Sequence, residues 1–281
     1  MSSKVCSIEE AADLISNGMV IALSGEVLHR IPMDFVRELI RQGKRQLTVV
    51  KTVSGLDVDM LAGSGCLSNA IFGAVTLEPA YGLARNFRRA VEKCRVNAIE
   101  HTCYTVIMSL RAAAYGIPFI PIGRINSDIT KIIDVREVID PYSREKVQVV
   151  RALKPEYAII HAHIADNRGN AVIEGIPPYY EKLISEASSN VIITTEKLVD
   201  KIGDQFKVTI PYFRVNVVVK SPFGAHPASM HPLYQVDEEH LKLYIEHSRS
   251  DESFNEYLRK YVFCGRLEYY KRVGLLEKLI C

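Results

Sequence analysis

The sequence lacks several features that would indicate a membrane, nucleic-acid-binding or secreted protein. None of its apolar runs approaches the roughly 18 residues that a membrane-spanning helix needs. Its formal net charge is +2, so charge gives no reason to expect a nucleic acid or a membrane surface as partner. The first residues contain no apolar signal-peptide core; Ser7 and Glu10 instead have the spacing of a helix capping box. We therefore expect a cytoplasmic protein.

Several common catalytic signatures are also missing. The sequence contains no Gly-x-Gly-x-x-Gly after a strand, no Gly-x-x-x-x-Gly-Lys-Ser/Thr and no Gly-x-Ser-x-Gly. Nicotinamide, P-loop and serine-hydrolase interpretations therefore have no motif to support them. The six cysteines show neither close pairing nor zinc-finger spacing, and we expect them to be reduced thiols.

What is present is an ordinary globular composition and a regular alternation of predicted strands and helices. Hydrophobic residues make up 48% of the chain and charged residues 24%, which is typical of soluble globular proteins. The alternation predicts an α/β fold, an open and mainly parallel sheet with helices on both faces. From about residue 237 the pattern is helical, and residues 1–281 are interpreted as one domain. Segment 125–143 is expected to be an irregular insertion. The predicted strands are 19–23, 47–52, 96–99, 119–122, 157–164, 190–194, 207–210 and 215–220.

The most specific local pattern is a polar loop between the first of these strands and a helix. The strand, 19–23, is a short unbroken apolar run, and Pro32 opens a segment with helical periodicity. The loop therefore lies at the carboxyl end of a strand, where open α/β sheets place their ligand crevices. We predict that it binds substrate through four residues, Ser24, Gly25, Glu26 and Arg30.

This loop resembles the glycine loop of the alpha-type subunit of family I CoA-transferases. Arg30 and Pro32 match the Arg-x-Pro ending of the glutaconate type, whereas Ser24-Gly25-Glu26 replaces the usual Gly-Gly-Phe. A carboxylate where the family has an aromatic ring could alter the choice of substrate. Further matches follow in the family's order and together cover roughly residues 5 to 275, among them 41–50, 83–92, 110–121, 159–170 and 222–227.

The resemblance implies a reaction and a partner. Family I CoA-transferases use a glutamate that attacks an acyl-CoA thioester, giving an acyl-glutamyl anhydride and then an enzyme-CoA thioester. In the family this glutamate lies in a Ser-Glu-Asn-Gly motif of the beta-type chain, and the present sequence has no such motif. The chain is thus expected to be the alpha-type subunit of a heteromer that moves CoA between an acyl-CoA and a small carboxylic acid. Coenzyme A is then a substrate, and no metal or permanently bound cofactor is implied.

Glu100 leaves a second interpretation open. It follows the predicted strand 96–99, and the matching glutamate is taken to be catalytic in related two-subunit hydrolases that open a ring of steroid-derived CoA thioesters. As a general base it would need a pKa raised by burial towards about 6–7. Otherwise it shapes the pocket, and in either case we expect it at the crevice. A third interpretation is a non-catalytic ligand-binding or regulatory chain, since fold alone does not fix function.

Two arginines complete the predicted site. Arg30 could bind a substrate carboxylate in bidentate fashion, and its alternatives are an ion pair with Glu26 or with the partner chain. Arg124 follows Pro121 in a loop that the family places near the pocket. His161 and His163 alternate on a strand and could ligate a metal, but the family carries no metal here, so we interpret them as structural.

Overall fold

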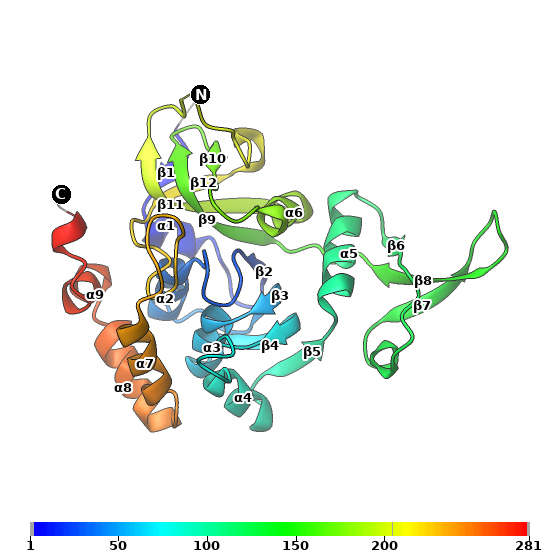
Figure 1. Ribbon diagram of the computed structural model, residues 1–281, viewed down its shortest axis with the longest axis horizontal. Helices are drawn as coiled ribbons and strands as arrows, with labels where there is room; N and C mark the ends of the chain where they lie inside the picture. Colours follow the sequence, from blue (N-terminus) through cyan, green and yellow to red (C-terminus); the bar gives the residue numbers. More distant parts are fainter. Residues whose placement is uncertain (1–2, 204, 280–281) are drawn as a thin grey trace.

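A nine-stranded sheet forms the centre of the described chain, residues 3–203 and 205–279, in a computed structural model (Figure 1). Its strand order is β1-β12-β11-β9-β2-β3-β4-β5, and every pair of neighbours in this order is parallel. The short β10 pairs antiparallel with β9. The predicted α/β class with an open, mainly parallel sheet is therefore confirmed.

The bounds of the elements are as follows. The strands of the main sheet are β1 (Val5–Cys6), β2 (Val20–Leu23), β3 (Leu47–Ser54), β4 (Leu67–Val75), β5 (Asn97–Glu100), β9 (Tyr157–Asp166), β10 (Ala171–Val172), β11 (Asn190–Val199) and β12 (Val217–Lys220). The helices are α1 (Ile8–Asp13), α2 (Met33–Arg41), α3 (Leu56–Gly63), α4 (Arg85–Glu92), α5 (Cys103–Ala114), α6 (Tyr179–Ala187), α7 (Glu238–His247), α8 (Asp251–Tyr261) and α9 (Arg266–Arg272). Short 3-10 turns are η1 (Asp128–Lys131), η2 (Tyr212–Arg214) and η3 (Glu277–Leu279).

Helices cover both faces of the sheet, and two apolar clusters lie beneath them. In β9 the neighbouring residues Ile159 and Ile160 belong to different clusters, because successive side chains of a strand point to opposite faces. Helices α1 to α4 and the C-terminal helices bury their apolar residues in one cluster, and α5 and α6 in the other. This double coverage explains why the central strands are nearly continuous apolar runs.

Buried polar contacts fasten the C-terminal helices to the first face. The Tyr244 hydroxyl of α7 donates to Asp59 of α3 at 2.6 Å, and burial raises the pKa of this carboxyl. Asp251 of α8 pairs with Arg89 of α4 at 2.5 Å and with Lys93 at 2.9 Å. The helical C-terminal segment expected from about residue 237 is therefore present and packed on the body. Within the described residues, no helix has the length and apolarity needed to cross a lipid bilayer.

Two local predictions are wrong. Segment 207–210 is not a strand, because only Ile210 finds a partner, in a single bridge to Ala171. Segment 125–143 is not an irregular insertion, because it contains η1 and β7 (Val135–Ile139). β7 pairs antiparallel with β8 (Lys146–Arg151), and β8 pairs with β6 (Phe119–Pro121). This second sheet projects from the body beyond α5 (Figure 1).

Parallel strands end at the same edge of a sheet, so the segments after β2, β3, β4 and β5 lie along one edge. The predicted glycine loop follows β2, in the middle of the sheet, and Glu100 ends β5, at its margin. Three strand spacings separate β2 from β5, which amounts to about 14 Å.

Candidate functional site

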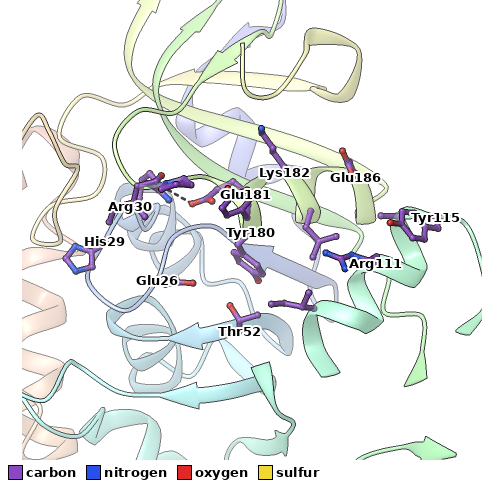
Figure 2. A pocket seen from close by; sticks show the side chains of 16 residues that line it. Glu26, His29, Arg30, Thr52, Arg111, Tyr115, Tyr180, Glu181, Lys182 and Glu186 are labelled. Atoms are coloured by element: carbon purple, nitrogen blue, oxygen red, sulfur yellow. Dashed lines mark hydrogen bonds and ion pairs between the residues drawn. The ribbon is translucent and has the colours of Figure 1, made fainter. Parts of the chain in front are cut away.

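A cleft of about 520 Å³ opens between the loop after β2, helix α5 and helix α6 (Figure 2). Its floor includes Thr52 of β3. The loop contributes Glu26 and Arg30, and Figure 2 shows the Glu26 side chain pointing into the cleft towards Thr52 and Tyr180. The remaining walls come from α5 and α6, and include Ile107, Arg111, Tyr180, Glu181 and Lys182.

The loop has a compact shape that requires glycine at one position. Gly25 has φ +73°, and a Cβ atom there would lie 2.2 Å from the carbonyl oxygen of His29. Glu26 and His29 exchange backbone hydrogen bonds of 3.0 and 2.7 Å across the turn. Val27 and Arg30 also adopt positive φ, at 47° and 57°. Left-handed non-glycine residues persist only where the surrounding structure fixes them, so this loop is held firmly in one conformation.

Ser24 lies behind the loop and does not line the cleft. Its side chain is fully buried, and its hydroxyl donates to the carbonyl of Arg30 at 3.2 Å. The same hydroxyl accepts a hydrogen bond from the backbone N–H of His161 at 2.9 Å. Ser24 therefore ties the two ends of the loop to strand β9, which is a positioning role.

Arg30 forms an ion pair with Glu181, which lies far from it in the sequence. Its Nε donates to Glu181 Oε1 at 2.9 Å, and its Nη1 donates to the carbonyl of Ile176 at 3.0 Å. The side chains of Arg30 and Glu181 are only 11% and 2% exposed. The alternative ion pair of Arg30 with Glu26 is not observed, because Arg30 pairs with Glu181 instead.

Tyr180, at the start of α6, lines the cleft, and its hydroxyl is already hydrogen-bonded within the chain. The hydroxyl of Tyr180 donates to the carbonyl of Val50 at 3.2 Å. Burial, reinforced by the nearby carboxylates of Glu181, Asp57 and Glu26, raises the pKa of Tyr180 well above its ordinary value. This phenol therefore stays protonated and is not a proton acceptor at neutral pH.

Glu100 and Arg124 lie outside the cleft. Glu100 is exposed at the end of the margin strand β5, so nothing in the described chain supplies the burial that the general-base interpretation requires. Arg124 is exposed beside the second sheet, where its Nε donates to Asn126 at 3.1 Å. The structure thus brings Glu26 and Arg30 together around Gly25, and leaves these two side chains apart from them.

A buried network behind the loop was not apparent from the sequence. His161 of β9 contacts Thr194 Oγ1 through Nδ1 and Glu196 Oε1 through Nε2, both at 2.8 Å. Glu196 also accepts from the Tyr234 hydroxyl and from the backbone N–H of Phe223 at 2.6 Å. The alternation of His161 and His163 marked these histidines, but Glu196 and Tyr234 lie too far along the chain for any local pattern to connect them.

His163 is likewise occupied by protein groups. Its Nε2 contacts the carbonyl of His231 at 2.9 Å, and its Nδ1 accepts from the backbone N–H of Glu174 at 3.1 Å. Burial lowers the pKa of His163, so the ring is neutral at physiological pH. Among the described residues, no group of three or more histidine, cysteine or acidic side chains is placed to hold a metal ion.

An open parallel sheet with a glycine-loop cleft at its carboxyl edge defines a class of α/β ligand-binding proteins. The family model of coenzyme A transferase matches residues 5–221, and the chain belongs to this family. The chain is 38% identical over 99% of its length to an uncharacterised protein of Archaeoglobus fulgidus, of which it spans 65%.

Two further relatives carry functional names. The A subunit of glutaconate CoA-transferase from Acidaminococcus fermentans is 30% identical, covering 93% of this chain and 88% of the relative. The A subunit of 3-oxoadipate CoA-transferase from Pseudomonas knackmussii is 29% identical, covering 92% and 94%. The resemblance inferred from the sequence is therefore confirmed.

Solved structures show the same fold. The crystal structure of glutaconate CoA-transferase from Acidaminococcus fermentans superposes with a TM-score of 0.87 at 29% identity, over 97% of this chain and 93% of that one. The crystal structure of a variant of the decarboxylase AibA/AibB gives a TM-score of 0.84 at 34% identity, over 92% and 100%. Proteins with different reactions thus share this architecture.

Proposed function

We propose that this chain is the alpha-type subunit of a heteromeric CoA-transferase, which moves CoA between an acyl-CoA and a small carboxylic acid. The observation that carries the proposal is the cleft at the carboxyl end of β2, formed around the glycine loop by residues of this chain alone. The two relatives with CoA-transferase names support it over most of the chain's length. Residues 1–281 act as one domain in this proposal, and the complex is cytoplasmic.

The loop supplies what thioester chemistry needs. Among the described residues, the backbone N–H of Gly25 has no hydrogen-bond acceptor, and in this proposal it donates to a developing oxyanion. A carboxylate with a pKa of about 4.3 is a poor nucleophile towards a thioester, so placement and binding energy from the CoA arm must provide the acceleration.

The nucleophile comes from the partner in this proposal. The sequence has no Ser-Glu-Asn-Gly motif, and Arg30 and Glu181 neutralise each other in the cleft wall. A beta-type chain would bring its glutamate to the open side of the cleft.

The test is an acyl-exchange assay on the complex purified with its partner chain. Acyl-CoA and an acceptor acid are mixed, and the CoA thioester of the acceptor is measured. We expect that product from the complex and none from this chain alone. Free CoA without the new thioester would contradict the proposal.

A hydrolase subunit is the second candidate, favoured by two observations. Glu100 lies at the carboxyl end of β5, and the cholesterol ring-cleaving hydrolase IpdA subunit of Rhodococcus jostii is 28% identical over 95% of this chain. In that case Glu100→Gln should abolish turnover by removing the base. If the transferase proposal holds, the exchange rate of Glu100→Gln should stay within about threefold of the unmodified complex, because Glu100 does not line the cleft.

A further inference from the structure

The cleft contains a carboxylate, that of Glu26, which has no hydrogen-bond or ion-pair partner among the described residues. Glu26 is exposed on the cleft wall and points towards Thr52 and Tyr180 (Figure 2). Within the described residues its side chain makes no hydrogen bond and no ion pair. Its backbone is nevertheless fixed, because it exchanges two hydrogen bonds with His29. The backbone of Glu26 is thus held in place, while its carboxylate has no protein donor among the described residues.

In the described part of the chain, no cation beside Glu26 is available to balance it or to attract a second carboxylate. Arg30 pairs with Glu181 at 2.9 Å, and the Tyr180 hydroxyl donates to the Val50 carbonyl at 3.2 Å. Among the described lining residues, the cations without an ion pair are Arg111 and Lys182, which belong to α5 and α6 and lie across the cleft from the loop (Figure 2).

Ligand chemistry follows from this arrangement. An ionised carboxylate only accepts hydrogen bonds. A ligand with a hydroxyl or ammonium group opposite Glu26 would supply the missing donor. A ligand with its own carboxylate there would bring two like charges together and leave both without a donor.

We propose that Glu26 sets the acyl selectivity of the cleft: it favours an acyl group bearing a hydrogen-bond donor, hydroxyl or ammonium, and rejects one bearing a second carboxylate. This inference rests on the proposed function for the identity of the ligand as an acyl group. It does not depend on which step of the reaction follows binding.

The test compares four acids of one chain length, butyrate, 4-hydroxybutyrate, 4-aminobutyrate and succinate, together with their five-carbon counterparts. Their dissociation constants are measured by calorimetry on the purified complex. We expect at least one donor-bearing acid to bind at least about tenfold more tightly than the diacid of equal length. The two donor-bearing acids distinguish hydroxyl from ammonium.

Variants assign the preference to one side chain. Glu26→Gln should reduce the ratio at least about fivefold, mainly by improving binding of the diacid. Glu256→Gln removes an equal charge from the exposed face of α8, away from the cleft, and should leave the ratio unchanged. Tighter binding of the diacid by the unmodified complex, binding of none of the acids, or an unchanged ratio in Glu26→Gln would overturn the inference.

The acyl-exchange assay keeps the two claims separate. If exchange occurs and Glu26→Gln leaves the binding ratio unchanged, the selectivity inference alone fails. If the ratio depends on Glu26 and no exchange occurs with any acid, the transferase proposal alone fails.

Discussion

At the scale of single residues, the shape of the cleft depends on Gly25. Its positive φ and the distance of only 2.2 Å between an added Cβ and the His29 carbonyl oxygen both exclude a side chain. The loop cannot relax outward easily, because Ser24 and the Glu26–His29 hydrogen bonds fix it on either side.

We therefore predict that Gly25→Ala displaces the loop and lowers kcat/KM of the complex at least about 100-fold. Gly18→Ala is the matched control, because Gly18 has φ +84° and nothing within 4 Å of the added Cβ. It should cost about 1–2 kcal/mol in free energy of unfolding and leave the rate unchanged. Equal rates for the two variants would contradict the importance of the close approach. Steady-state kinetics and urea unfolding measure both quantities.

The buried ion pair leads to a second prediction. Glu181→Gln leaves the Arg30 guanidinium buried without its counter-charge, and should lower the free energy of unfolding by about 3 kcal/mol. Glu186→Gln, on the exposed side of the same helix, should change it by less than about 0.5 kcal/mol. Urea unfolding of both variants is the measurement, and similar values for the two would refute a structural role for the pair.

The sequence predicted part of the site, for reasons that specific residues show. Gly25, Glu26 and Arg30 could be placed at a crevice because strand, polar loop and helix start follow one another locally. The partner of Arg30 could not be predicted, because Glu181 lies 151 residues further along the chain. The crevice position of Glu100 was predicted from the family resemblance, and in the structure Glu100 ends the margin strand β5 and does not line the cleft.

At the scale of elements, neither helix α3 nor strand β4 was predicted from the sequence. Helix α3 is buried on nearly all sides, so its apolar and acidic residues show no amphipathic period, and strand β4 carries polar residues and Gly73 in its interior. Segment 207–210 has strand-like residues but no neighbour with which to pair along its length. A local sequence pattern predicts a helix or strand whose burial is regular along the chain. It fails where tertiary contacts determine which secondary structure a segment forms.

The C-terminal helices give a pH prediction. Burial lowers the pKa of His240 to about 3 and also lowers that of His226, so both rings stay neutral in the folded chain. His240 contacts Tyr257 at 2.9 Å, and the other rings and charges around it are His226, Tyr261, Tyr269, Asp237 and Arg37. Unfolding exposes each histidine to an ordinary pKa near 6.5.

Because the unfolded chain binds protons that the folded chain does not, the stability contributed by these neutral rings is complete above pH 6.5 and falls as the pH drops below it. Protonation of His240 in the unfolded chain should cost about 2 kcal/mol of stability at pH 5. The free energy of unfolding, measured by urea titration from pH 7.5 to 5, should fall less steeply in His240→Gln. A pH dependence identical to that of the unmodified chain would show that His240 is not kept neutral by the fold.

At the scale of the whole molecule, the cleft lies at the carboxyl edge of the sheet, and in the proposed function it forms one side of an active site. In that proposal the chain contributes a fixed glycine loop, with Gly25 as the oxyanion donor and Glu26 as the carboxylate that selects the acyl group. Strand β5 is the last strand of the main sheet and ends in the exposed Glu100, and the second sheet projects past α5 (Figure 1). The proposed function requires a second chain to complete the site.

The most direct test of this account is the intact mass of each chain in the purified complex after acyl-CoA is added without an acceptor acid. We predict a CoA adduct on the partner chain and none on this chain, because the proposed function places the nucleophilic glutamate on the partner. An adduct on this chain, or release of CoA with no adduct on either chain, would contradict the central claim.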